Sequence, residues 1–380
     1  SGGQNGALKV CSWEKRELDS TFEWKQPSPI HCVTSVSLGP EELILSGGGD
    51  GIVRVWHKGT PQPVQKLEGH ELTVTGVTAC VSAPHKVLSG SLDCSVRYWD
   101  ADTGSQVSSC TIDSNRISCL KWINREGSMV VQAGEDSTIR LWDVRAMKKP
   151  AGMIVHSHNS RITACDSSAD GNMLLTSASG IDGVGCELRL WDRRVGRKLA
   201  GALKGHVQSV TCCAFLPLTL SAMSKTQLVV SASEDGTIRT WDLQSSQCLD
   251  VATLDTKHSI TSLSVCTKPP ASLPASSEAR LVTSSISGGL GLWSVWRGGN
   301  LRLLDEASHE KLLGCKAETE RSGEATETSA QEAERPGGRS ETAGQEMQRP
   351  GPCQAPGRAS QAPATRDARN DDQGGGDLAR

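Results

Sequence analysis

The sequence predicts an all-β fold: a seven-bladed β-propeller of four-stranded antiparallel blades, with the first blade incomplete at the N-terminus, followed by a disordered C-terminal tail. Two observations predict the propeller. Tryptophan recurs at regular intervals, and the same polar turn and alternating strand precede most of these Trp residues. A third observation, the loss of large apolar residues near the C-terminus, marks its end. We therefore expect a propeller over residues 1–308 and a low-complexity tail over residues 309–380.

The Trp residues mark the repeating unit. The chain has 10 Trp but only one Tyr and two Phe, so Trp is used for a particular purpose. Seven of them follow one another at intervals of 43 to 52 residues, which is the length of one four-stranded blade. They are Trp13, Trp56, Trp99, Trp142, Trp191, Trp241 and Trp293.

The text before each Trp predicts a hairpin. Residues 89–100 read SGSLDCSVRYWD and residues 231–242 read SASEDGTIRTWD, each with an Asp six residues before the Trp. Alternating β-branched residues after a short polar turn indicate a strand, and the apolar run before the turn indicates its antiparallel partner. An apolar run upstream and a weaker one after the Trp complete four strands.

The first copy is shorter than the others. Residues 1–13 supply a turn at Asn5 and one strand that ends at Trp13, without the two strands that precede the turn elsewhere. A propeller avoids exposed strand edges by closing its ring. We therefore expect that the sequence is truncated at its N-terminal end.

The recurring text resembles that of the WD-repeat family, with Gly-His about thirty residues before Trp-Asp and a turn Asp between them, over about residues 1–307. The resemblance implies a structural tetrad in each blade, in which buried His, Ser, Asp and Trp side chains share hydrogen bonds; such a network is tolerated in a core because every polar group is satisfied. The third copy offers His70, Ser89, Asp93 and Trp99, and the sixth offers His206, Ser231, Asp235 and Trp241.

Other copies carry only part of the tetrad. The fourth copy keeps Asp136 and Trp142 but has Gln132 and Asp113 at the Ser and His positions, and the seventh has Ser287 at the position of the turn Asp. The fifth copy, SGIDGVGCELRLWD, has about three extra residues, so Asp182 falls nine residues before its Trp. The turn of the fifth copy cannot have the common geometry.

The insertion in the fifth copy and the KWINRE segment of the fourth copy resemble the sequences of one group of animal WD-repeat proteins. The narrower resemblance implies a cytoplasmic setting at the cilium or the ciliary base, with partners among small-GTPase regulators.

No enzyme, cofactor or metal is expected. A set of Ser, His and Asp is also found in hydrolase triads, but here it recurs in different blades, which a single catalytic site does not require. The glycines at 47–49 precede a strand and lack the Lys of a phosphate loop, and His156 and His158 have no further metal ligands nearby. The 14 Cys lie mostly in apolar runs, as buried thiols do.

Protein–protein interaction remains as the predicted function, and the loops of the rigid scaffold are where binding residues belong. The turns and the GHELT loop line one face of the ring, and the long loops 217–228 and 267–279 line the other. The candidate interaction residues on the first face are Asp50, Glu71, Asp136 and Asp182.

A second hypothesis is a substrate receptor of a cullin-RING ubiquitin ligase. Such receptors carry WDxR in consecutive blades, and this chain has that motif twice, ending at Arg145 and at Arg194. Five copies also carry Arg two residues before the Trp, and we expect these side chains to pack within the blades rather than to bind an anion.

Charge and hydropathy limit the partners. A formal net charge of −3 does not favour nucleic acid, and no apolar run is long enough to insert in a membrane. From residue 316 onward the chain has no Val, Ile, Phe, Tyr or Trp, so it cannot offset the entropy of ordering. We therefore expect a monomeric propeller that acts within a complex. Its partners are other proteins, either small-GTPase regulators or a ligase adaptor.

Overall fold

The computed structural model divides the chain into two compact units, Ser1–Glu324 and Ala325–Arg380. The described residues all lie in the first unit, so the predicted tail is outside them. None of these residues belongs to a helix of the length and hydropathy that crossing a membrane requires. The described residues are 2–12, 17–22, 28–38, 41–58, 60–123, 127–154, 157–198, 201–217, 227–254, 258–266, 279–296 and 298–308.

Within these residues the strands form six antiparallel blades, which keep the numbers of their sequence copies. Blade two is β3 (Ile30–Leu38), β4 (Glu41–Gly48), β5 (Val53–His57) and β6 (Gln65–Leu67), and blade three is β7 (Val74–Cys80), β8 (Ala83–Ser91), β9 (Ser95–Asp100) and β10 (Ser105–Thr111). Blade four is β11 (Ile117–Trp122), β12 (Met129–Gly134), β13 (Ile139–Asp143) and β14 (Gly152–Ile154). Blade five is β15 (Ile162–Ser167), β16 (Met173–Ala178) and β17 (Glu187–Asp192), whose outer edge pairs with both β18 (Arg197–Lys198) and β19 (Leu203–Lys204). Blade six is β20 (Val210–Phe215), β21 (Leu228–Ser233), β22 (Thr237–Asp242) and β23 (Gln247–Thr253), and blade seven is β24 (Ile260–Cys266), β25 (Ala279–Ser285), β26 (Gly289–Val295) and β27 (Leu301–Ser308).

The prediction of seven blades is wrong, because the residues that the structure describes form six. The first copy forms only a two-stranded sheet of β1 (Leu8–Ser12) and β2 (Glu17–Phe22). The physical reason is the amount of chain. A blade needs four strands, and the described residues before β3 form one turn and two strands, so they do not make up a seventh blade.

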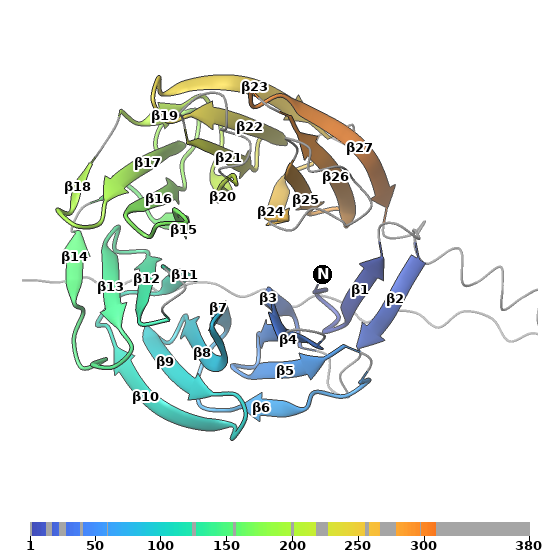
Figure 1. The fold of residues 1–380 in the computed structure, drawn as a ribbon, viewed down its shortest axis with the longest axis vertical. Coiled ribbons are helices and arrows are strands. Elements are labelled where there is room, and N and C mark those ends of the chain that lie inside the picture. Colours follow the sequence, from blue (N-terminus) through green and yellow to red (C-terminus); the bar gives the residue numbers. More distant parts are fainter. Residues whose placement is uncertain are drawn as a thin grey trace, which may run out of the picture. The chain divides into compact units, whose positions relative to one another are not determined.

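The blades are arranged around a ring (Figure 1). The first strand of each blade lies nearest the centre and the fourth lies at the rim, and β1–β2 lies between blades two and seven. Because neighbouring strands are antiparallel, the turns between second and third strands lie on the same face as the connections between blades. We call this face the turn face, and the other the opposite face.

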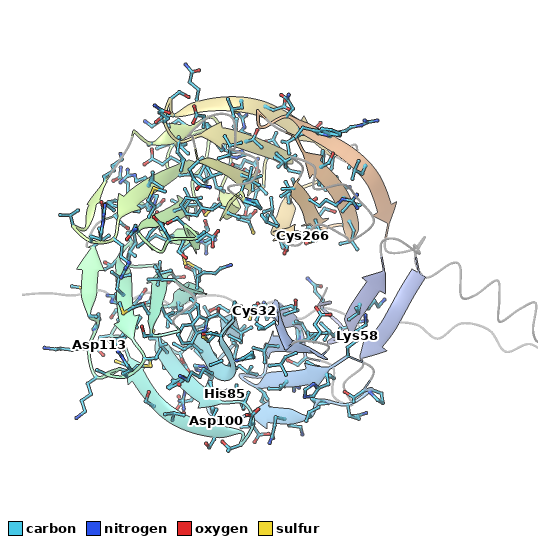
Figure 2. All side chains as sticks on the ribbon, viewed as in Figure 1. Cys32, Lys58, His85, Asp100, Asp113 and Cys266 are labelled. Carbon is cyan, nitrogen blue, oxygen red and sulfur yellow. The ribbon has the colours of Figure 1, made fainter. Side chains whose placement is uncertain are left out.

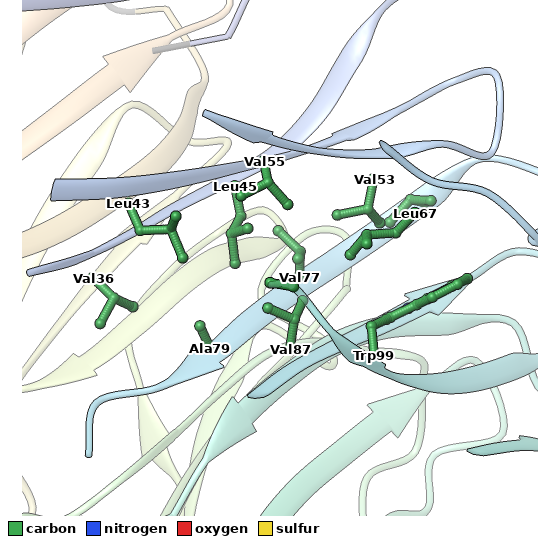
Figure 3. Packing of buried hydrophobic residues seen from close by; sticks show 12 residues of the cluster. Val36, Leu43, Leu45, Val53, Val55, Leu67, Val77, Ala79, Val87 and Trp99 are labelled. Carbon is green, nitrogen blue, oxygen red and sulfur yellow. The ribbon is translucent and has the colours of Figure 1, made fainter. Parts of the chain in front are cut away.

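The hydrophobic core lies between blades. Leu45, Val53 and Val55 of blade two pack against Val87 and Trp99 of blade three (Figure 3). Burying each of these aliphatic side chains contributes about 1.5–3 kcal/mol. Every described blade repeats this arrangement, in which the Trp side of one blade packs against the preceding blade.

A row of hydroxyl groups joins the first strands of successive blades. Each is the second residue of its strand, where the register shifts by one residue. Thr75 of blade three donates to the carbonyl oxygen of Ile117 in blade four at 2.5 Å, and Thr211 of blade six donates to that of Ile260 in blade seven at 2.8 Å. This hydroxyl row comprises Thr75, Ser118, Thr163 and Thr211.

Candidate functional site

The predicted tetrad of blade three is a continuous chain of hydrogen bonds. Trp99 donates its Nε1–H to Ser89 Oγ at 2.7 Å, and Ser89 Oγ lies 2.7 Å from His70 Nε2. His70 Nδ1 lies 2.9 Å from Asp93 Oδ2. A neutral imidazole with its proton on Nδ1 satisfies this order, since it donates to Asp93 and accepts from Ser89.

Blade six repeats the chain with nearly the same distances. Trp241 Nε1 lies 2.9 Å from Ser231 Oγ, which lies 2.8 Å from His206 Nε2. His206 Nδ1 lies 3.0 Å from Asp235 Oδ2. Ser231, like its counterpart in blade three, has no exposed surface, so its hydroxyl cannot reach a substrate. The geometry is that of a structural network and not of a hydrolase triad.

Electrostatics keep the two turn carboxylates ionised. Burial opposes the charge of Asp235, but hydrogen bonds from His206, Thr237 and the Val207 N–H outweigh it and hold the pKa of this carboxyl well below its usual range. Asp93 shows the same balance, and its pKa is also lowered. Burial lowers the pKa of His70, against the opposing influence of Asp93, so this imidazole is neutral near pH 7.

In blades two and four an Arg takes the place of the His. Arg54 Nη1 and Nη2 lie 3.2 and 2.5 Å from the Asp50 carboxylate oxygens. Arg140 Nη2 lies 2.5 Å from Asp136 Oδ2. Both Arg residues stand two positions before the Trp, so the expected packing within the blade includes an ion pair with the turn carboxylate. Asp50 and Asp136, predicted as interaction residues, are thus engaged inside their own blades.

Two other Arg residues that stand two positions before a Trp make different contacts. Arg97 donates from Nη1 to Gln106 Oε1 at 2.5 Å, and Arg189 donates from Nε to Glu187 Oε1 at 2.6 Å. Arg97 also lies over Gly69, where an added Cβ would be 2.8 Å from Nη1. The Gly of the Gly-His pair therefore leaves room for this guanidinium.

Blade four departs from the expected tetrad. Trp142 Nε1 lies 3.5 Å from Gln132 Oε1, a long contact. Asp113, at the position of the His, is exposed (Figure 2). The buried residue beside this turn is Asn115, whose Oδ1 accepts from the Asp136 N–H at 3.4 Å.

Blade five contains a His that the sequence analysis did not assign to a tetrad. His158 Nε2 lies 2.7 Å from Thr176 Oγ1, which also accepts from Trp191 Nε1 at 2.9 Å. The spacing in the sequence could have identified this His, because His158 precedes the first strand of its blade by four residues, as His70 does in blade three. Asp182 is exposed, and Gly185 stands six residues before the Trp. His158 Nδ1 is buried without a hydrogen-bond partner among the described residues.

Blade seven and the first copy carry shortened versions. Trp293 donates to Thr283 Oγ1 at 2.9 Å, and Ser287 Oγ lies 2.9 Å from Ser285 Oγ in the turn. In the first copy Trp13 lies outside the described residues. The pairing of β1 with β2 shifts register at Cys11. In blade six the pairing of β22 with β23 shifts register at Trp241, so Cys11 occupies the position that corresponds to this Trp.

We predict that His158→Gln reduces the loss of stability on acidification. Burial, with Arg189 and Lys198 nearby, lowers the pKa of His158 to about 3, whereas the unfolded chain takes up this proton near pH 6.5. Stability from the neutral imidazole is therefore present above pH 6.5 and is lost as the pH falls. Between pH 7 and 5 the wild type should lose about 2 kcal/mol more than the variant, as measured by urea unfolding. Parallel pH profiles would contradict this assignment.

The two WDxR motifs have matching geometry on the opposite face. Arg145 donates from Nε and Nη2 to the two carboxylate oxygens of Asp143 at 2.9 and 2.6 Å, and Arg194 donates to those of Asp192 at 3.0 and 2.7 Å. The bond to Arg194 lowers the pKa of Asp192 to about 2. The side chains of Arg145 and Arg194 are 74% and 65% exposed, so both planar groups are presented to solvent in one orientation.

The turn face carries an exposed apolar cluster over blades five and six. The insertion in blade five closes a small bridge, with Ile181 N donating to Val184 O at 3.2 Å and Val184 N to Ile181 O at 3.0 Å. Gly183 N donates to Val207 O at 2.8 Å and fixes the insertion against the loop of blade six. We call Ile181, Val184 and Val207, which are 75%, 78% and 52% exposed, the insertion patch.

Acidic side chains surround the insertion patch. Asp182 and Glu234 are exposed beside it. Burial raises the pKa of the neighbouring Cys186 thiol, and the charges of these two carboxylates raise it further. Glu71, the candidate of blade three, is exposed on the same face. Sequence reasoning found Asp182 and Glu71 but missed the valines, because single apolar residues in loops carry no pattern of their own.

The described residues place no three His, Cys, Asp or Glu side chains where they could hold a metal ion. Burial raises the pKa of the Cys212 and Cys213 thiols on β20. The loops 218–226 and 267–278, which contain most of the predicted long loops, lie outside the described residues.

Fold and tetrads together define a WD-repeat propeller, and comparison with known families agrees. The family model "WD domain, G-beta repeat" matches residues 22–57, 61–100, 104–143, 151–192 and 197–242, which is more than half of the chain. The protein belongs to the WD40 repeat family. Propellers of this family are generally non-enzymatic scaffolds that bind other proteins.

Several proteins are similar over part of the chain. Nuclear distribution protein nudF of Aspergillus niger is 26% identical over 271 residues, which cover 64% of this chain and 56% of nudF. Nuclear distribution protein PAC1 of Arthroderma benhamiae is 32% identical, covering 66% and 58%. The ribosome biogenesis protein WDR12 homolog of Oryza sativa is 30% identical, covering 56% and 43%. The chain thus spans less than two thirds of the length of these relatives.

One solved structure resembles the fold. The computationally designed Ika8 protein superposes with a TM-score of 0.56 and 24% identity, covering 81% of this chain and 83% of Ika8. At this identity the likeness concerns the fold alone.

Proposed function

We propose that this protein is a non-enzymatic scaffold that binds other proteins through the turn face of blades five and six. The insertion patch carries the proposal, because its two inserted aliphatic side chains are among the most exposed in the described chain. The hydrogen bonds within the insertion hold these side chains in place, so little ordering entropy is lost when a partner binds.

The charges beside the insertion patch define the partner's chemistry. Asp182 and Glu234 are acidic and exposed, so a complementary segment presents an apolar side chain next to Lys or Arg. The narrower resemblance, to WD repeat-containing protein 31 of animals, supports small-GTPase regulators as partners and a cytoplasmic setting at the cilium or its base.

The test is quantitative affinity purification with mass spectrometry. We expect Ile181→Ser with Val184→Ser to reduce recovery of a specific partner about tenfold or more. The matched control is Val81→Ser with Val195→Ser, since these side chains are 66% and 64% exposed on the opposite face. Equal recovery of all partners by wild type and both variants would refute the proposal.

A second proposed function is the ligase substrate receptor, supported by the matching presentation of Arg145 and Arg194. We predict that Arg145→Ala with Arg194→Ala abolishes co-purification of the ligase adaptor and leaves the thermal unfolding midpoint unchanged, because both guanidinium groups are exposed. Arg116→Ala with Arg302→Ala is a control of equal charge. Absence of an adaptor from purified wild-type protein would end this hypothesis.

A further inference from the structure

In four of the described blades a turn carboxylate accepts hydrogen bonds from a His or an Arg of the same blade. The pairs are Asp50 with Arg54, Asp93 with His70, Asp136 with Arg140 and Asp235 with His206. Blade five has both kinds of donor, His158 and Arg189, but the residue six positions before its Trp is Gly185. No carboxylate of the described residues accepts from His158 Nδ1, so blade five has the donors of this motif without its acceptor.

His158 carries its proton on Nδ1. Its Nε2 lies 2.7 Å from Thr176 Oγ1, which already accepts from Trp191 Nε1 at 2.9 Å. The hydroxyl proton of Thr176 is directed to Nε2, because its other acceptor, the carbonyl oxygen of Arg189, is 3.4 Å away. Nδ1 is therefore the donor, as in the tetrads of blades three and six. His158 is only 3% exposed, and a buried donor without an acceptor is costly.

A second donor follows the first along the chain. In blade three the N–H of Glu71, the residue after the tetrad His, donates to Asp93 Oδ2 at 3.0 Å. In blade six the N–H of Val207 donates to Asp235 Oδ2 at 3.0 Å. The corresponding residue of blade five is Asn159, whose N–H makes no hydrogen bond with the described part of the chain. In the two complete tetrads both donors thus converge on one oxygen atom, and blade five repeats both donors.

The charges around these donors favour an anion over a neutral acceptor such as water. Burial lowers the pKa of His158, and the positive charges of Arg189 and Lys198 lower it further, so the imidazole lies in a positive potential. The carboxylate of Glu187 is engaged elsewhere, because it accepts from Arg189 Nε at 2.6 Å and pairs with Lys204 Nζ at 3.9 Å. Two buried or partly screened cations therefore act on a place that no described carboxylate occupies.

We propose that blade five binds a halide ion, such as chloride, between the Nδ1–H of His158 and the N–H of Asn159. The ion takes the position of the single carboxylate oxygen on which the same two donors converge in blades three and six. A spherical monovalent anion fits this position best, because the donors point to one atom and the imidazole is buried. The halide site lies inside the blade and is separate from the exposed side chains of the insertion patch.

The test measures chloride binding to the 380-residue protein at pH 8 and constant ionic strength, with sodium gluconate replaced stepwise by sodium chloride. At this pH His158 is neutral, so binding is not coupled to its protonation. We expect the protein to broaden the chlorine NMR line of chloride, and bromide to reverse the broadening by competition. The thermal unfolding midpoint should rise by about 2 °C when chloride exceeds its dissociation constant about tenfold.

Variants of the protein locate the halide. His158→Gln should abolish both the broadening and the rise of the midpoint, because a Gln amide can keep the contact with Thr176 but has no donor at the Nδ1 position. Lys198→Met, a change at an exposed residue, should weaken chloride binding about twofold or more. Lys149→Met, at an exposed Lys of blade four, is the control of equal charge and should leave binding unchanged. A wild-type midpoint that does not respond to chloride, or equal broadening by wild type and His158→Gln, would overturn the proposal.

Discussion

Asp235→Ala and Asp93→Ala each lower the free energy of unfolding by about 1–3 kcal/mol. In blade six the Asp235 carboxylate accepts from Thr237 N at 2.9 Å, Thr237 Oγ1 at 2.6 Å and Val207 N at 3.0 Å, besides His206. Alanine removes all of these acceptor oxygens, and of the two groups near the His206 Nδ1–H it leaves only Thr237 Oγ1, at 3.1 Å. Because the side chain is nearly buried, water replaces the acceptor poorly.

Urea unfolding measures both losses, and Asp102→Ala is the matched control. Asp102 is exposed in a turn of blade three, so its removal should change the free energy of unfolding by less than about 0.5 kcal/mol. If both tetrad variants matched this control, the hydrogen-bonded chain would contribute nothing to stability.

Arg54→Met destabilises the protein by about 1–3 kcal/mol, whereas Arg97→Met costs less than about 1 kcal/mol. The two Arg residues stand at the same position in blades two and three. Arg54 is 5% exposed and pairs with Asp50, whose pKa is lowered through that pair against the effect of burial. In blade three the turn carboxylate is satisfied by hydrogen bonds from His70, Ser95 and the Glu71 N–H, so the loss of Arg97 breaks no ion pair with it.

A double-mutant cycle separates this ion pair from simple packing. Asp50→Ala combined with Arg54→Met should show a coupling of about 1–2 kcal/mol, and Asp93→Ala combined with Arg97→Met a coupling near zero. Equal coupling in the two blades would contradict the exchange of Arg for His.

The sequence was sufficient to predict the strands of blades two to seven and the tetrads of blades three and six, because their turns and strands follow a local pattern. The turn Asp, the alternating strand and the Trp lie within twelve residues of one another, and the repeat aligns them. The same periodicity led to the wrong blade number, because it counted the Trp at position 13 as a seventh blade. Blade number depends on whether all four strands are present, and β1–β2 are only two.

Other features depend on contacts between segments that no local pattern encodes. The pairing of Arg140 with Asp136 occurs because a His is missing four residues before β11, in a different part of the copy. The insertion patch combines a turn of blade five with a loop of blade six that is more than twenty residues away. Val282 is 36% exposed, whereas the residues at the same register position in the other five blades are fully buried, and this difference is visible only when the six blades are compared in space.

The hydroxyl row has a consequence for how such a ring changes over evolution. Each donor is a side chain, but each acceptor is a backbone carbonyl, so this hydrogen bond, unlike the apolar packing between blades, does not depend on the side chains of the following blade. The acceptor strand can therefore change its sequence without losing the bond, provided that its backbone keeps the same position. Substitutions and insertions in one blade, such as the insertion of the fifth, are tolerated at this contact as long as the apolar packing is kept.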